Sequence, residues 1–200
     1  STDESDRLFV VNGDDGTMAV YSILVGQNVI APSRFSTDGD FLAVAVEVAD
    51  VYVIVKRTIN GQIRYLLEKF DSDLTLDSAK TGGAASSVNM TQLQGETVQI
   101  VRDGVVEAEQ VVPASPYTIT FATAATSSYE VGLNYTVTAR TMPAEPVLAS
   151  GSVQGFKKRI VQVDAIVNNT QAMTINNKQV SFRAFGENVL DTAVVPFTGI

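Results

Sequence analysis

Short runs of apolar and β-branched residues, separated by polar turn residues, follow one another along most of the chain. The clearest case is residues 51–70, where the apolar run 51–55 and the mixed run 62–70 flank Asn60 and Gly61. Asn-Gly suits a type I′ turn because both central residues need a positive φ, so the stretch predicts a β-hairpin. The continuous apolar run predicts a first strand covered on both faces, whereas the second strand is half exposed.

A two-residue turn would also set the register of this hairpin. Ile59 then pairs with Gln62, which places Arg57 opposite Arg64. Two arginines that face each other repel. The pattern leaves three alternatives open: a carboxylate lies nearby, this face of the hairpin borders another element or chain, or the loop is longer than two residues.

The same reading extends to the whole N-terminal third of the chain. Turn signals at residues 13–16 and at Thr37-Asp38-Gly39 separate further predicted strands, and Pro32 places the third of them at a sheet edge or a bulge. The sequence of hairpin, strand, turn, strand and hairpin within residues 7–70 predicts about one and a half blades of a β-propeller. Such a piece buries its faces only against neighbours and should not be stable alone. The predicted strands cover residues 7–12, 17–24, 29–36 and 41–48.

The fold class predicted for the chain is all-β, built from antiparallel hairpins, with partial propeller-like blades followed by small sandwich-like or barrel-like modules. Helical periodicity is weak, and only residues 86–93 or 186–190 could hold a short helical turn. Beyond residue 90 the strands are predicted at 96–102, 105–112, 117–122, 128–141, 157–168, 173–175 and 179–185, with a loop over 142–155. The domain prediction is a blade-like segment over 1–72, a flexible connection over 73–90, a β-module over 91–141, and a second β-module or completing strands over 142–200.

Composition narrows the functional classes. The chain has 200 residues, 45% of them apolar, a net charge of −8, no cysteine and no histidine. No apolar run approaches the ~20 residues of a membrane-spanning helix, and the missing residue types exclude disulfides, thiolate or imidazole metal sites and Ser-His-Asp chemistry. The acidic start at Ser1 lacks the features of a signal peptide, so either an initiator Met was removed or the chain is a piece of a longer protein.

No catalytic pattern or cofactor site emerges from the remaining residues, and the chain is predicted not to be an enzyme. Lys80-Thr81-Gly82 matches a β-lactamase tripeptide but lacks its partner motif. The aspartates at 71, 73 and 77 have the spacing of an oxygen-ligand loop without the glycine and glutamate of an EF-hand. Two alternatives stay open: a carbohydrate-binding or adhesive β-module with aromatic residues beside those aspartates, and a glycan-cleaving enzyme with paired carboxylates in a cleft.

The one basic run of the chain is Lys157, Lys158 and Arg159. Three charges are fewer than the patches that indicate nucleic-acid binding. The run is either a solvated start of the strand predicted at 160–167 or a contact with an acidic neighbour such as another subunit. Together with Arg57 and Arg64, these residues are the candidate subunit contacts.

Several short segments resemble, in the same order along the chain, the tail nozzle proteins of short-tailed bacteriophages, also called tail tubular protein B or tail hub proteins. The resemblance spans nearly the whole chain and concerns turns and strands, although Asn134 stands where the family pattern has proline. The family's proteins are several times longer, so the chain would be a fragment of one. The segments are 8–12 (LFVVN), 37–39 (TDG), 57–61 (RTING), 64–71 (RYLLEKFD), 93–98 (LQGETV), 103–104 (DG), 131–136 (VGLNYT), 157–160 (KKRI) and 185–187 (FGE).

The resemblance implies a structural virion protein, made in the bacterial host cytoplasm and located in the phage tail. It implies a homo-oligomeric ring that forms the DNA-ejection channel and offers surfaces to an adaptor and to fibres or a needle. DNA would pass without specific binding, because a lumen of net negative charge repels phosphates. We therefore expect no broad stripe of lysine and arginine on a surface that faces the lumen.

Overall fold

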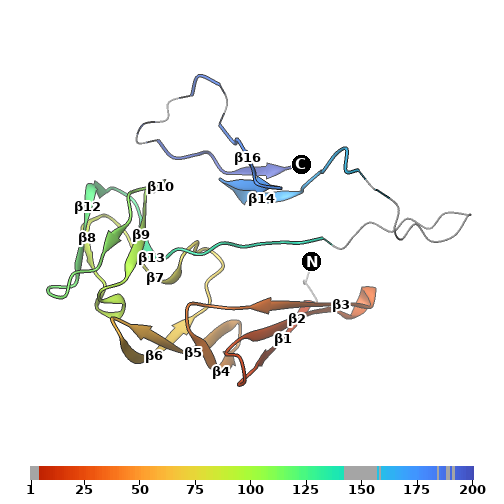
Figure 1. The fold of residues 1–200 in the computed structure, drawn as a ribbon, viewed down its shortest axis with the longest axis horizontal. Coiled ribbons are helices and arrows are strands. Elements are labelled where there is room, and N and C mark those ends of the chain that lie inside the picture. The colour runs from red at the N-terminus through yellow and green to blue at the C-terminus, as the bar shows by residue number, and fades with distance from the viewer. Residues whose placement is uncertain (1–4, 142–156, 158, 184, 188–189, 191) are drawn as a thin grey trace, which may run out of the picture. The chain divides into compact units, whose positions relative to one another are not determined.

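A computed structural model describes residues 5–141, 157, 159–183, 185–187, 190 and 192–200, and over these residues the fold is all-β, as predicted (Figure 1). The chain divides into two units, Ser1–Tyr135 and Thr136–Ile200. The loop predicted over 142–155 lies outside the described residues. None of the helical segments in the described part of the chain has the length and hydrophobicity that a membrane-spanning helix needs.

The chain begins with a three-stranded antiparallel meander of β1 (Ser5–Val11), β2 (Met18–Leu24) and β3 (Val29–Phe35), with the 3₁₀ turn η1 (Val25–Gln27) between the last two. The tight turn after β1 closes with a 2.8 Å hydrogen bond from the Asn12 N–H to the Thr17 carbonyl. β3 is an edge strand, as Pro32 predicted, because proline cannot donate to a second neighbour.

A second meander follows, with β4 (Asp40–Glu47), β5 (Asp50–Ile59) and β6 (Gln62–Lys69) in that order. Ile59 pairs with Gln62, so the predicted two-residue turn and its register are confirmed. Asn60 and Gly61 have φ values of 49° and 71°, the left-handed conformation that a type I′ turn requires.

The two meanders bury one another's apolar faces in one core cluster: Met18, Val20, Phe41, Val53 and Val55. The Phe70 ring lies beside this cluster, with its centroid 6.5, 6.0 and 6.4 Å from those of Phe9, Phe35 and Phe41. The prediction that 51–55 is covered on both faces was wrong, because Ile54 is 42% exposed while Val53 and Val55 are buried. Each sheet has three strands, and the finer prediction of propeller blades stays a prediction.

Residues 73–90 are not the flexible connection that their small, polar composition predicted. They contain β7 (Asp77–Gly82) and β8 (Ala85–Asn89), which pair with strands about 50 and 30 residues later in the chain. Local composition could not show this, since the partners that order these strands are remote in sequence. The predicted boundary between 1–72 and 91–141 is therefore absent, and both ranges belong to the first unit up to Tyr135.

The rest of the first unit is a β-module around a second core. Its strands are β9 (Thr97–Arg102), β10 (Val105–Val106), β11 (Gln110–Val111), β12 (Thr118–Ala125) and β13 (Tyr129–Leu133). β9 lies at the centre of its sheet and pairs with β10, β11 and β13, while β12 pairs with β8. The 3₁₀ turn η2 (Thr91–Leu93) falls within the predicted range 86–93, but η1 lies outside both ranges, so the prediction that only those ranges could hold a helical turn was wrong. The fully buried side chains of this core include Met90, Leu93, Val98, Ile100 and Val131.

The described residues of the second unit form four short strands, β14 (Val167–Thr170), β15 (Met173–Ile175), β16 (Lys178–Val180) and β17 (Phe197–Gly199). β14 pairs with β17 and β15 with β16. The boundary of this unit falls after Tyr135, whereas the sequence predicted it after residue 141. Of the strand predicted at 157–168, only residues 167 and 168 belong to a strand among those described, because β14 starts at Val167.

Gly132 in β13 allows a close approach of two strands and is a test of this arrangement. A Cβ there would lie 2.7 Å from the Asp77 carbonyl oxygen and 2.9 Å from the Ala79 Cα, both of them backbone atoms of β7. Gly132→Ala is expected to lower the free energy of unfolding by about 1–3 kcal/mol, because β7 must move away. Urea denaturation followed by circular dichroism measures this. Gly13→Ala, where the added Cβ has open space around it, should change stability far less.

Candidate functional site

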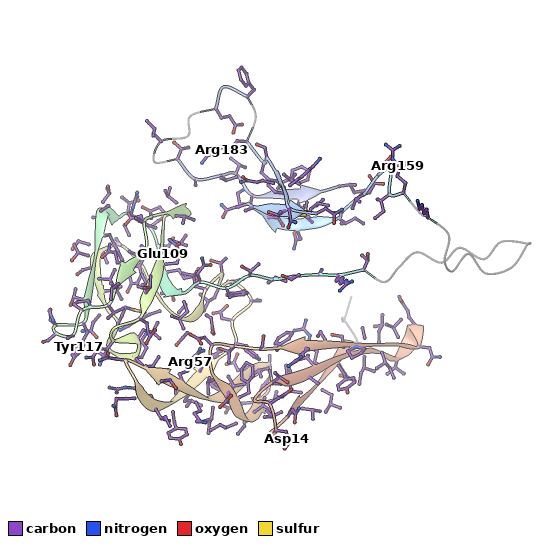
Figure 2. The ribbon with its side chains drawn as sticks, in the orientation of Figure 1. Asp14, Arg57, Glu109, Tyr117, Arg159 and Arg183 are labelled. Carbon is purple, nitrogen blue, oxygen red and sulfur yellow. The ribbon has the colours of Figure 1, made fainter. Side chains whose placement is uncertain are left out.

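A densely bonded polar site of the first unit is centred on Arg57 (Figure 2). β5 alternates in burial from Val53 onward, and its inward positions include Val55, Arg57 and Ile59. Arg57 therefore enters the protein interior between two aliphatic side chains and is 1% exposed. A buried guanidinium is stable only when its charge and its donors are matched, and the neighbouring strands supply the partners.

All five N–H groups of the Arg57 guanidinium have an acceptor. The Nε and Nη2 atoms donate to the two Glu68 carboxylate oxygens at 2.9 and 2.8 Å, which is a bidentate ion pair. Nη1 and Nη2 donate to the two Asp77 oxygens, both at 3.0 Å, and Nη1 also donates to the Asp38 carbonyl at 2.8 Å. The single side chain thus joins β6, the start of β7 and the turn before β4.

The two carboxylates are held in turn by hydroxyl groups. Thr37 Oγ1 donates to Asp77 at 2.6 Å, and Ser78 Oγ donates to Glu68 at 2.9 Å. We call Arg57, Glu68, Asp77, Thr37 and Ser78 the Arg57 network. Burial alone would lower the pKa of Arg57, but the hydrogen bonds to Glu68 and Asp77 and their charges outweigh it and raise the pKa overall. The guanidinium is a fixed cation that crosslinks strands.

This network decides among the alternatives that the hairpin register left open. Arg57 does stand opposite Arg64, and the carboxylates of Glu68 and Asp77 compensate its charge. Arg57 is therefore not a subunit contact, which corrects that prediction, because its donors are used within the chain and it is buried. The predicted register already placed the side chains of Glu68 and Arg57 on the same face of the hairpin. The sequence could therefore have identified Glu68 as a partner of Arg57. Asp77 had no such signal.

Of the other candidate contact residues, Arg64, Lys157 and Arg159 are exposed. Arg64 lies on β6 in the first unit, and Lys157 and Arg159 lie in the second. Lys158 lies outside the described residues. Arg64 and the basic run belong to different units, and as subunit contacts they stay predictions.

The aspartates considered as a calcium loop have other roles. Asp77 belongs to the Arg57 network, and the Asp71 side chain accepts a 3.0 Å hydrogen bond from the Asp73 N–H, as turn aspartates commonly do. Across the described residues, no three acidic side chains are grouped so that they could hold a metal ion. Lys80 lies on β7 and donates to the Asn89 carbonyl at 3.0 Å, so the Lys-Thr-Gly tripeptide is part of a strand.

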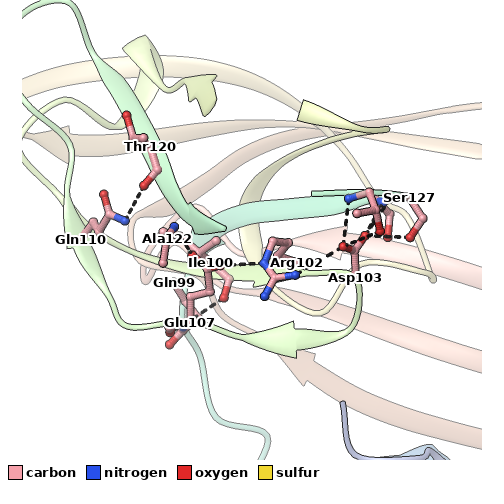
Figure 3. A network of polar contacts seen from close by, with 11 residues as sticks. Gln99, Ile100, Arg102, Asp103, Glu107, Gln110, Thr120, Ala122 and Ser127 are labelled. Carbon is pink, nitrogen blue, oxygen red and sulfur yellow. Dashed lines mark hydrogen bonds and ion pairs between the residues drawn. The ribbon is translucent and has the colours of Figure 1, made fainter. Parts of the chain in front are cut away.

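A second polar site orders the hairpin between β9 and β10 (Figure 3). The Asp103 carboxylate accepts hydrogen bonds from the N–H groups of Thr126, Ser127 and Ser128 at 2.8–3.0 Å and from two of their hydroxyls. Beside it, Arg102 Nε donates to Glu107 at 2.7 Å. These bonds connect the turn before β10 to the turn before β13 and leave the carboxylate with structural partners only.

The Asp103 bonds predict a pH effect. Hydrogen bonds from the Ser128 and Thr126 backbone, and from Ser127, hold the pKa of Asp103 far below its ordinary value of 3.8. A lowered pKa in the folded state contributes stability above pH 3.8 that is lost progressively as the pH falls below it. Asp103→Asn should lower the melting temperature at neutral pH and flatten its decline below pH 3.8. Thermal unfolding from pH 2 to 7 measures this, with Asp14→Asn in another turn as control.

Comparison with known proteins gives no information on the function of this chain. No family model matches the chain, and no curated protein is significantly similar to it. The functional interpretation therefore depends on the residues themselves and on what their arrangement can do.

Proposed function

We propose that this chain is a structural subunit of a bacteriophage tail nozzle, a ring of identical chains through which DNA leaves the particle. The proposal starts from the resemblance of the short segments to tail nozzle proteins. Two of those segments, 57–61 and 64–71, belong to β5, β6 and their turn, and a third, 37–39, is the turn that Arg57 bonds. These three segments supply Arg57, Glu68, Thr37 and the Asp38 carbonyl to the crosslink, whereas Asp77 and Ser78 lie outside them.

The single observation that carries the proposal is that every hydrogen-bond donor of the buried Arg57 guanidinium bonds to a neighbouring segment. Arg57 offers five donors and all of them meet acceptors that fix neighbouring strands, so this buried polar site connects those strands mechanically. A subunit that must withstand the pressure of passing DNA benefits from crosslinks of this kind, because breaking one leaves an uncompensated buried charge.

The charge balance also supports a channel that DNA passes without adhering. The chain carries −8 overall, and several cations of the two meanders already have a carboxylate partner: Arg34 with Asp15 and Lys56 with Asp40 at 3.3 and 3.1 Å, and Lys69 with Asp50 at 2.9 Å. Paired cations release few counterions from DNA, so they add little affinity for it.

Mass spectrometry of purified particles tests the proposal. Trypsin cuts after Arg57 and Arg64, so residues 58–64 give a diagnostic peptide. We expect that peptide in tailed particles, within a polypeptide much longer than this chain, and antibody labelling at the end of the tail distal to the capsid. The proposal is wrong if the peptide occurs only in the particle-free fraction of infected cells. Labelling confined to the capsid would also contradict it.

A further inference from the structure

β6 is the outermost strand of its sheet, and its far edge is open to the addition of another strand (Figure 1). Within the described part of the chain it pairs with β5 alone, over eight consecutive residue pairs with no bulge. Natural edge strands usually carry a proline, a bulge or an inward charge that prevents pairing with another chain. β6 has no proline and no bulge. Its two inward charges, Arg64 and Glu68, have opposite signs, so they permit backbone pairing in a register that sets one opposite the other.

The hairpin geometry shows which backbone groups point to that edge. Residue pairs alternate between hydrogen-bonded and non-bonded along an antiparallel ladder, and the pair flanking a two-residue turn, Ile59 and Gln62, is bonded. The even-numbered residues of β6 therefore bond to β5, and the 2.9 Å bond from the Phe70 N–H to the Val51 carbonyl continues this phase. The odd-numbered residues present their N–H and C=O groups to the free edge: Ile63, Tyr65, Leu67 and Lys69.

The edge of the first meander is built differently. The bond between Asn12 and Thr17 sets the alternation there, so the backbone groups of Tyr21 point to β1. Pro32 is opposite Tyr21, which places its nitrogen on the open side of β3. β3 thus lacks a donor in the middle of its edge and presents a proline ring instead, which protects it against strand addition. β6 has no such protection.

The side chains of β6 favour burial against another strand. Ile63, Tyr65 and Leu67 are 59%, 65% and 74% exposed and share one face of the sheet. Ile54, opposite Leu67, extends this apolar strip onto β5. At its end, Lys69 is neutralised by Asp50. The strip can therefore meet an uncharged surface although the chain as a whole is acidic.

We propose that β6 pairs antiparallel with β6 of a second copy of this chain, about a two-fold axis at Leu66. In this register the outward backbone groups of Tyr65 meet those of Leu67 in the other copy, and those of Ile63 meet Lys69. On the inner face, Arg64 stands opposite Glu68 of the other copy, twice by symmetry. An axis at Tyr65 or at Leu67 opposes no unlike charges, so charge complementarity selects Leu66.

Arg64 gains a partner in this pairing that it lacks on its own hairpin, where it stands opposite Arg57. Glu68 can accept a further bond, because a carboxylate has about four acceptor sites and Arg57 and Ser78 use three of them. The contact is isologous and closes at two copies, whereas a ring needs a contact between unlike surfaces. Either contact can therefore exist without the other, and the pairing goes beyond the proposed function.

Sedimentation of the full chain over a roughly hundredfold range of concentration tests the pairing. Arg64→Glu places a carboxylate opposite Glu68 of the other copy and should raise the dissociation constant of the dimer at least about tenfold. It leaves the monomer fold intact because Arg64 is exposed and faces Arg57. Arg7→Glu, the same charge change on the exposed part of β1, is the matched control and should leave the dissociation constant unchanged.

Amide hydrogen exchange locates the contact. The N–H groups of Ile63, Tyr65 and Leu67 should gain protection as the concentration rises, while those of Arg64 and Leu66, already bonded to β5, are protected throughout. Tyr65→Pro removes one outward N–H donor of β6 and keeps the bonds to β5. It should therefore weaken the pairing as Arg64→Glu does, and circular dichroism checks that the variant folds.

Unprotected Tyr65 and Leu67 amides in the associated chain would overturn the pairing, as would a chain that stays monomeric. A ring with these amides unprotected would overturn the pairing and leave the nozzle proposal standing.

Discussion

Replacing Arg57 with methionine is expected to lower the free energy of unfolding by about 3–5 kcal/mol, the cost of removing one partner from a buried ion pair. Methionine fills much of the same space but leaves Glu68 and Asp77 facing each other without a cation. The Asp38 carbonyl also loses its donor. Because the chain has no tryptophan, urea denaturation followed by far-ultraviolet circular dichroism is the suitable measurement.

Arg64→Met is the matched control for this experiment. It removes the same side chain from the position directly opposite on β6, where the arginine is exposed. Measured on the monomer, its effect should stay within about 0.5 kcal/mol, as for other surface substitutions. Equal effects of the two substitutions would contradict the role assigned to the Arg57 network. The free energy would then reflect the general removal of charge.

Ile100→Ala is expected to cost about 2–5 kcal/mol, because it removes a fully buried side chain and leaves a cavity. Ile100 lies on β9, the central strand of the sheet that also contains β13, and it stands opposite Val131. Its surroundings are pinned by strands on both sides and cannot collapse easily around the missing atoms. The same denaturation measurement applies.

Ile30→Ala on β3 provides the comparison, since it removes the same atoms from a side chain that is exposed. Its cost should be below about 0.5 kcal/mol. If the Ile30 and Ile100 variants unfold at the same urea concentration, then β9 is not at the centre of a packed core. That result would refute the arrangement of β9 between its neighbours.

The β5–β6 hairpin shows which features could be predicted from residues close together in the sequence. Asn60 and Gly61 specify the turn, and the turn specifies every residue pair down the ladder, including Arg57 opposite Arg64. The carboxylates that compensate this unfavourable pair do not all come from the hairpin itself. Asp77, which accepts two of the Arg57 hydrogen bonds, is 20 residues away, in a segment whose composition predicted a linker.

The strands β7 and β8 could not be predicted from local sequence. Residues such as Gly82, Ser86 and Ser87 have low strand propensity, and they favour a loop when only neighbours in sequence are considered. They form strands because β13 and β12 offer backbone partners and because Val88 is buried in the core. Burial and remote pairing outweigh propensities that amount to about 1 kcal/mol or less per residue.

Turn chemistry and alternation, which depend on residues a few positions apart, were thus sufficient to identify an all-β chain, the register of its best hairpin and the edge position of β3. Three features needed the folded chain: the face of β5 that is buried, the carboxylates that neutralise Arg57, and the division into units after Tyr135. The reason is physical. Local rules act through dihedral angles and adjacent hydrogen bonds, whereas burial and charge pairing depend on groups that only chain folding brings within reach.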